Sequence, residues 1–306
     1  MSFSGETNLE WHKAPYADGV MIGDAPKDGP TVGILGGVHG DEFSGIAVAD
    51  LLPRSLAVEA GRVIVMLGNL PAIDAEKRQS APSTDAVNHN LNRWFRHLSD
   101  DQKIRADLPY EANRAQELIG YIDECDAILD LHEFEDPKGT PFIITERPSR
   151  ETARAIGAPF IAHGFADAEP GGTDDYGYRN GIEAICYELG PMGKQFTAGN
   201  VVYALETVDR FLAAQSLTSK RLRPLHSNPT LIQVDENSPI VRTQDAFRFA
   251  REFKSFETLV RGELVAVDGE REIYAAEDED QVMLFYKPEV PAIGREACEL
   301  ARVVTE

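Results

Sequence analysis

The sequence predicts an α/β fold: a mixed, mostly parallel sheet with helices on both faces, followed by a small β-rich C-terminal domain. Over the first 215 residues, short and continuous apolar runs alternate with segments of helical length. Strands that are buried on both faces have such continuous runs, and their alternation with helices is typical of α/β proteins. Beyond about residue 216, alternating segments are separated by Asp-Gly and Asn/Pro turns. We therefore expect two domains, 1–215 and 216–306.

The individual elements follow from these patterns. Strands are expected in six apolar runs, at 31–37, 62–70, 127–134, 141–146, 159–165 and 184–190. Helices are expected at 41–56, 110–125 and 200–215, and shorter strands at 231–236, 247–253, 263–275 and 281–287. The polar segment 76–95 is expected to be a long loop, and loops of that length in compact domains are often functional.

The charge balance limits the classes of partner. The chain of 306 residues has 51 acidic and 30 basic residues, a net charge of −21. This excess argues against nucleic acid or an anionic membrane as the main partner, because both require a basic surface. No stretch approaches the ~20 apolar residues of a membrane span, and no secretory signal is visible at the start. Three widely spaced cysteines, Cys125, Cys186 and Cys298, indicate reduced thiols in a cytoplasmic protein.

The stretch "GILGGVHGDEFSG" indicates a metal site. Ligands of an open α/β sheet bind beyond the carboxyl ends of its strands. His39 follows the first apolar run and Glu42 begins the next helix, so both side chains can converge on one ion. The spacing alone is weak, since a polar loop before a helix also explains it. Phosphate binding is disfavoured, because no phosphate-binding glycine motif is present and Asp41 and Glu42 would repel an anion.

A third ligand is found in "ILDLHEF". His132 ends another apolar run, and catalytic zinc usually has three protein ligands and one open position. Asp130 lies on the same side of that strand and could orient a histidine. His163 also ends an apolar run and remains an alternative ligand. Two histidines and one glutamate suit zinc better than calcium or magnesium, although iron, cobalt or manganese could use the same ligands.

Two further motifs carry candidate substrate-binding and catalytic residues. In "HNLNRWF", Asn92 and Arg93 are adjacent, and a guanidinium binds a carboxylate with two parallel hydrogen bonds. In "AICYELGP", Glu188 ends an apolar run, where a carboxylate can take a proton from a metal-bound water. Taken alone, Arg93 is better explained as a surface arginine beside a turn, and Glu188 can be a structural glutamate at a strand end.

Together, "GGVHGDE", "NLNRWF", "LDLHEF" and "CYELGP" resemble the succinylglutamate desuccinylase/aspartoacylase family of zinc hydrolases, which is related to the zinc carboxypeptidases. The motifs occur in the expected order over roughly residues 30–200. The resemblance implies a zinc carboxypeptidase-like fold and one zinc ion, bound by His39, Glu42 and His132. It also implies that Asn92 and Arg93 hold the carboxylate of the substrate and that Glu188 is the general base.

Three further positions follow less directly from the resemblance. The family has an upstream arginine that polarises the scissile carbonyl, and Arg78 is the best match, with Lys77 as the alternative because an apparent insertion at 80–87 shifts the alignment. An arginine shortly before the catalytic glutamate contacts the substrate in the family, and Arg179 matches it roughly. The family usually has an aspartate two positions before the asparagine, where this chain has Asn90.

The function predicted from the sequence is zinc-dependent hydrolysis of the amide bond of a small N-acyl amino acid. Glu188 would take a proton from the attacking water, and Arg78 or a neighbour would stabilise the tetrahedral intermediate. One alternative is a zinc carboxypeptidase that acts on peptide C-termini, and another is a non-catalytic protein that binds zinc or an amino acid. No nucleic acid or membrane partner is expected, and a homodimer is one possible assembly.

Overall fold

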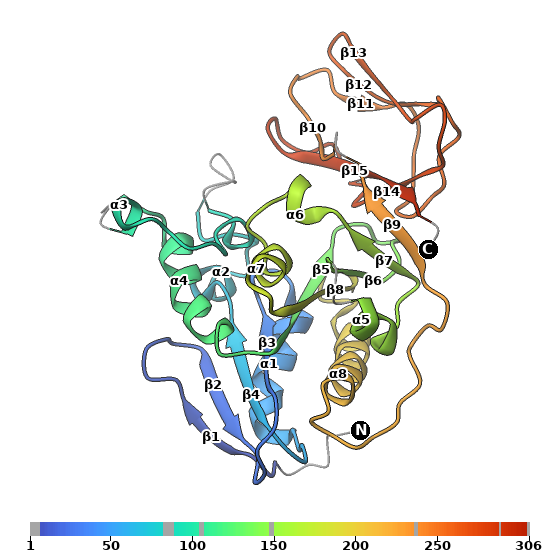
Figure 1. Cartoon of the computed structure of the whole chain (residues 1–306). Coiled ribbons are helices and arrows are strands. Elements are labelled where there is room, and N and C mark those ends of the chain that lie inside the picture. Colours follow the sequence, from blue (N-terminus) through green and yellow to red (C-terminus); the bar gives the residue numbers. More distant parts are fainter. Residues whose placement is uncertain are drawn as a thin grey trace.

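The computed structural model describes residues 7–81, 89–103, 107–146, 150–235, 238–287 and 289–304. These residues form a layered α/β structure, and a β-rich C-terminal part covers one end of it (Figure 1). Most of the apparent insertion at 80–87 lies outside the described residues. No helix in the described part of the chain is long and apolar enough to cross a membrane.

The main sheet has twelve strands among the described residues, in the order β1-β2-β4-β3-β5-β8-β6-β7-β9-β15-β10, with β14 paired to β15. Their bounds are β1 (Glu10–Lys13), β2 (Val20–Asp24), β3 (Thr31–Gly36), β4 (Arg62–Leu67), β5 (Ala127–Phe134), β6 (Phe142–Ile144), β7 (Phe160–His163), β8 (Glu183–Pro191), β9 (Thr230–Val234), β10 (Ile240–Val241), β14 (Gln281–Leu284) and β15 (Glu296–Val303). All six strands expected in the first 215 residues are present. A second sheet contains β11 (Arg248–Phe249), β12 (Leu264–Asp268) and β13 (Arg271–Tyr274).

The centre of the main sheet is parallel and its other part reverses direction. Strands β4, β3, β5 and β8 are parallel, so their carboxyl ends meet at one edge. Strand β6 pairs antiparallel with β8, and β7 and β9 follow the direction of β6. The predicted mixed, mostly parallel sheet is thus confirmed.

The helices cover both faces of this sheet. Their bounds are α1 (Phe43–Ser55), α2 (Leu70–Asp74), η2 (Leu91–Arg93), α3 (Asp100–Lys103), α4 (Tyr110–Ile122), α5 (Arg150–Ile156), α6 (Phe165–Ala168), α7 (Thr173–Asn180) and α8 (Thr197–Ala214). One apolar core joins α1, α5 and α8 to the sheet, and a second joins α4 and α7 to it. The three helices expected from the sequence are present.

The C-terminal residues continue the main sheet and also build a small core of their own. Strand β9 pairs parallel with β7, and β15 pairs antiparallel with β9. Strands β10, β12, β13, β14 and β15 contribute to a separate apolar cluster. The sequence patterns did not predict β15, although it joins the two parts. The domain boundary near residue 216 remains a prediction.

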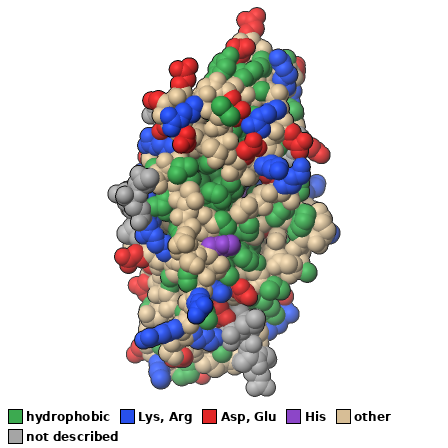
Figure 2. Space-filling view, turned by 90° about the vertical axis from the view of Figure 1, so that its right-hand side faces the viewer, with side chains coloured by type: hydrophobic (Ala, Val, Ile, Leu, Met, Phe, Trp, Pro, Cys, Tyr) green, Lys and Arg blue, Asp and Glu red, His purple; other side chains and the backbone are tan. Residues whose placement is uncertain are grey.

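Charged side chains of both signs are mixed on one face of the molecule (Figure 2). On the face shown in Figure 2, acidic and basic side chains lie side by side among apolar ones. The negative excess of the chain is therefore not gathered on this face.

Candidate active site

A pocket opens at the carboxyl ends of β3, β5 and β8. The turn after β3 and the start of α1 approach these strands closely. A Cβ atom on Gly36 would lie 2.3 Å from the carbonyl oxygen of Gly45, and one on Gly45 would lie 2.7 Å from that of Leu131. Larger residues would push α1 away from both strands. The glycines thus let α1 begin beside β5.

This close packing brings His39, Glu42 and His132 together, with ligand atoms within 4.8 Å of one another. The Nδ1 atom of His39 lies 2.6 Å from Oε1 of Glu42, and Nδ1 of His132 lies 3.1 Å from Oε2. All three side chains are buried. Oε2 of Glu42 accepts no hydrogen bond. The three residues expected from separate sequence motifs therefore form one candidate metal site.

The other ring nitrogens of both histidines have partners outside this cluster. Nε2 of His39 lies 3.1 Å from Oδ1 of Asn90, and Nε2 of His132 lies 2.9 Å from Oδ2 of Asp130. Asp130 also accepts a 2.7 Å hydrogen bond from Thr173. Such partners place the proton on Nε2 and leave Nδ1 free to bind a metal. Asn90, the departure from the family pattern, thus contacts His39 with a neutral amide.

The pKa shifts of these groups have identifiable causes. Burial lowers the pKa of His39 and the charge of Arg78 lowers it further, to about 4. Burial also lowers the pKa of His132, but the Asp130 carboxylate outweighs burial and raises this pKa well above its usual value. Burial raises the pKa of Glu42, yet the two histidines hold it far below its usual range. An ionised Glu42 beside a neutral His39 is a donor set that fits zinc.

The alternative ligand His163 lies elsewhere. Its strand, β7, runs antiparallel to β5 and β8, so its carboxyl end lies at the opposite edge of the sheet. Neither group of candidate metal ligands in the described residues contains His163. The second such group is Asp130, His132 and Cys186, which shares His132 with the first.

Glu188 lies beside this cluster. It is the register partner of His132 on the adjacent strand, and neighbouring partners project to the same face. The side chain is buried, its Oε2 has no hydrogen-bond partner, and burial raises its pKa to about 8. A buried carboxyl with a raised pKa in a pocket is a candidate acid or base.

Arg78 and Asn92 also line the pocket. Nη1 of Arg78 donates a 3.1 Å hydrogen bond to Oε1 of Glu42, whereas Lys77 is exposed and is not among the lining residues. Oδ1 of Asn92 is buried and has no hydrogen-bond partner. Of the two candidates for the carbonyl-polarising residue, Arg78 is therefore the one at the metal cluster.

Arg93 and Arg179 differ from the expectation. Nη2 of Arg93 lies 2.6 Å from Glu169 and 3.5 Å from Glu296, so its guanidinium already has two carboxylate partners. Arg179 is about half exposed, pairs with Asp175 at the end of α7, and does not line this pocket. The structure thus brings Arg93 to the site and leaves Arg179 outside it.

Comparison with known proteins identifies the family of the chain. A family model described as the succinylglutamate desuccinylase/aspartoacylase catalytic domain matches residues 28–215, more than half of the chain. The chain belongs to this family. The resemblance found in the four sequence motifs is thereby confirmed.

Individual relatives are more distant. The chain is 28% identical over 208 residues to N-alpha-acetyl-L-2,4-diaminobutyric acid deacetylase of Halomonas elongata, covering 64% of this chain and 58% of that protein. It is 31% identical over 121 residues to N-acyl-aromatic-L-amino acid amidohydrolase (carboxylate-forming) of Homo sapiens, covering 37% and 36%. The matches span less than two thirds of either relative. The crystal structure of succinylglutamate desuccinylase from Vibrio parahaemolyticus shares the fold, with a TM-score of 0.70 at 16% identity over 97% of this chain and 91% of that one.

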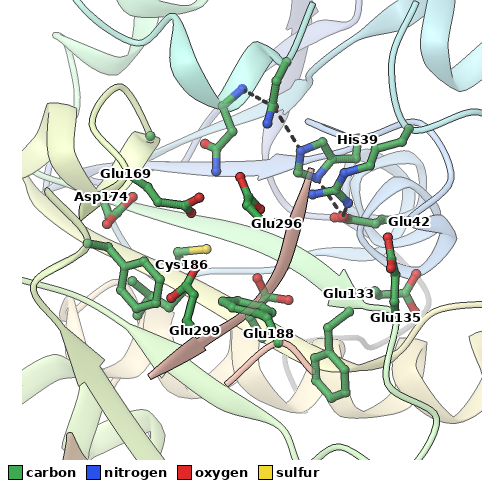
Figure 3. A pocket seen from close by; sticks show the side chains of 18 of the residues that line it. His39, Glu42, Glu133, Glu135, Glu169, Asp174, Cys186, Glu188, Glu296 and Glu299 are labelled. Atoms are coloured by element: carbon green, nitrogen blue, oxygen red, sulfur yellow. Dashed lines mark hydrogen bonds and ion pairs between the residues drawn. The ribbon is translucent and has the colours of Figure 1, made fainter. Parts of the chain in front are cut away.

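Within this family fold, the pocket has an acidic wall that the sequence motifs did not reveal. The wall residues that the motifs missed are Glu169, Asp174, Glu296 and Glu299, labelled in Figure 3. Burial raises the pKa of Asp174 to about 6. The available signal was a pair of glutamates, Glu296 and Glu299, inside the mostly apolar stretch "EACELARV". Because β15 was not predicted, these glutamates had no predicted place in the fold.

Proposed function

We propose that the protein is a zinc-dependent hydrolase that cleaves the amide bond of a small N-acyl amino acid. The observation that supports this most strongly is the convergence of His39, Glu42 and His132 beside the buried, unpartnered carboxyl of Glu188. The family match and the names of the two relatives, both of which describe N-acyl amino acids, agree with this proposal.

His39, Glu42 and His132 would hold the ion. When bound, zinc would polarise the acyl carbonyl and lower the pKa of a water molecule to about 7. Asp130 and Asn90 would hold the two imidazole rings in the orientation that exposes Nδ1. Oε2 of Glu42, which accepts no hydrogen bond, would find its partner in the ion.

Glu188 would carry the proton. Its carboxylate would take a proton from the attacking water and return it to the nitrogen of the leaving amine. Burial raises the pKa of Glu188 in the metal-free protein, and the positive charge of a bound ion would lower this pKa toward the range in which the carboxylate can accept the proton. Arg78 would donate a hydrogen bond to the acyl oxygen as negative charge develops on it.

Asn92 and Arg93 would hold the carboxylate of the amino acid. Arg93 has the two-pronged donor geometry that this contact requires. Nη2 of Arg93 pairs with Glu169 and Nη1 donates a hydrogen bond to the backbone carbonyl oxygen of Asn92, so the substrate carboxylate would share the guanidinium with these partners or displace Glu169. The homodimer, the cytoplasmic location and the identity of the metal remain predictions.

The test is metal analysis coupled to amine release. Purified protein is assayed on a panel of N-acyl amino acids and on peptides with free C-termini, before and after chelation and after zinc is restored. We expect about one zinc per chain and zinc-dependent release of amine from N-acyl amino acids. Cleavage only at peptide C-termini would support the carboxypeptidase alternative. Bound zinc with no hydrolysis of any amide would support the non-catalytic alternative.

A further inference from the structure

The acidic wall of the pocket is built by a bulge in β15. Val241 pairs with Glu296 and Ile240 with Cys298, so β15 has one extra residue between these pairs. On a regular strand, residues three apart project to opposite faces of the sheet. The extra residue of the bulge brings the two side chains to the same face. Glu296 and Glu299 therefore both line the pocket, although the alternation of the sequence would separate them.

These two glutamates meet Glu169 and Arg93. Arg93 pairs with Glu169 and Glu296, and the carboxyl groups of Glu169 and Glu296 also hydrogen-bond to each other. The guanidinium of Arg93 and one proton shared between Glu169 and Glu296 can thus balance the two negative charges of these carboxyl groups. Burial and the interaction with Glu296 raise the pKa of Glu169 to about 7, although Arg93 opposes the shift.

Within the described residues, Oε2 of Glu299 has no hydrogen-bond partner, and the charges of Arg93 and Lys287 act on this carboxyl only from a distance. Glu299 is 2% exposed and lines the pocket. Burial, and then the charges of Glu169 and Glu296, raise its pKa well above the usual value. Lys287 also lines the pocket, but its ammonium group lies within ion-pair distance of Glu135, at 4.0 Å. A buried carboxyl without a cationic partner is costly, so this place in the pocket favours a positive charge.

The whole pocket has the same imbalance. Its described lining contains eight acidic side chains and three arginine or lysine side chains, so acidic groups are in excess by five. A zinc ion, with two positive charges, would offset two of these five. Figure 3 shows carboxyl groups of the acidic wall directed into the pocket. Phe165 and Phe285, with ring centroids 6.2 Å apart, line the pocket beside these groups. Aromatic rings accommodate an alkyl chain and attract its terminal cation.

We propose that Glu299, with Glu169 and Glu296, binds a cationic amino group on the side chain of the substrate, which makes the substrate an N-acyl diamino acid. This inference rests on the proposed function and names its substrate class. An alkylammonium is compact and has three N–H donors, which matches several converging carboxylates. A diamino acid has a carboxylate and an ammonium a few bonds apart. Arg93 would bind the carboxylate and the glutamates would bind the ammonium group, so the substrate complements the charges of the pocket.

The test compares two nearly isosteric substrates, N-α-acetylornithine and N-acetylnorleucine, with the zinc-loaded protein. We expect kcat/KM to be ~10–100-fold higher for the ornithine derivative, the range of a hydrogen bond to a charged group. Glu299→Gln should bring this ratio close to one, mainly by lowering kcat/KM for the ornithine derivative. Retained hydrolysis of the norleucine derivative also shows that the variant is folded. If Glu299→Gln proves unstable, Glu296→Gln is expected to lower the ratio in the same direction.

Glu135→Gln is the matched control. It removes the same charge from a pocket residue that pairs with Lys287 instead of Arg93, and it should change the ratio much less than Glu299→Gln does. Equal rates for the two wild-type substrates, or an equal loss of the ratio in both variants, would overturn the inference. If no N-acyl amino acid is hydrolysed, the proposed function fails. Calorimetric binding of free ornithine and norleucine then tests the inference separately, and equal affinity for both would overturn it.

Discussion

The two ends of the pocket are built on different principles. At the metal end, His39 and His132 each have one ring nitrogen directed at Glu42 and the other held by Asn90 or Asp130. At the acidic end, which consists of Glu169, Glu296 and Glu299, three carboxyl groups converge. Oε2 of Glu299 has no hydrogen-bond partner among the described residues. The first arrangement presents the donor atoms of a metal site, and in the second the charges of Arg93 and Lys287 do not keep the pKa of Glu299 from rising well above its usual value. We infer that the metal end performs chemistry and that the acidic end selects the amino acid.

The largest expected effect is a loss of kcat without a loss of zinc, which distinguishes the general base from the metal ligands. Glu188→Gln should lower kcat by ~10²–10⁴-fold, because proton transfer by a positioned side chain contributes a factor of this size. Zinc content, measured by metal analysis, should not change. Glu135→Gln, a similar change elsewhere in the pocket, should keep most of the activity. A Glu188→Gln variant with near-normal turnover would show that another group is the base.

The next effect concerns the support of the metal ligands. Asp130→Asn should weaken zinc binding by ~10–100-fold, because Asp130 orients His132 and raises its basicity. Competition with a chromogenic chelator measures this affinity. The fold should persist, since Thr173 can still donate to the amide oxygen. Unchanged affinity would mean that Asp130 has only a structural role.

Asn90→Asp restores the residue usual in the family and should have a smaller, opposite effect. A carboxylate beside Nε2 of His39 would make that ring more basic. Zinc affinity should rise by less than about tenfold in the same chelator assay. Comparison with Asp130→Asn shows whether the partners of His39 and His132 affect zinc affinity to different extents. Weaker zinc binding in Asn90→Asp would contradict the role given to Asn90.

The smallest effect is a pH dependence at the acidic end. Since burial raises the pKa of Glu169 from 4.5 to about 7, the folded state retains a proton that the unfolded state loses between these values. This contribution makes the folded state less stable as pH rises through that window. Glu169→Gln should therefore gain stability relative to the wild type between pH 4.5 and 7. Thermal unfolding of the metal-free proteins across this range measures the difference, and a constant difference would contradict the assignment.

The sequence predicted the metal end much better than the acidic end, for a physical reason. His39, Glu42, His132 and Glu188 all follow apolar runs, and the carboxyl ends of parallel strands meet at one edge. The positions of Glu296 and Glu299 follow neither from the meeting of strand ends nor from the alternation of side chains along a strand. A bulge in β15 changes the face to which each of them projects. The position of Arg93 was predicted, but its carboxylate partners were not.

His163 shows the same limit within the main sheet. Its apolar run resembles those before His132 and Glu188, so the sequence suggested an equivalent position. The strand direction reverses between β8 and β6, and this reversal places His163 at the other edge. Strand direction depends on pairing between distant segments, which local patterns do not record.

One measurement tests both ends of the pocket together. The zinc-loaded wild-type protein is assayed for amine release from acetylated ornithine, norleucine and glutamate, which carry a positive, a neutral and a negative side chain. We predict release that disappears on chelation and is fastest for ornithine and slowest for glutamate. Fastest release from the glutamate derivative would contradict the role of the acidic wall, and release that persists without metal would contradict the zinc site.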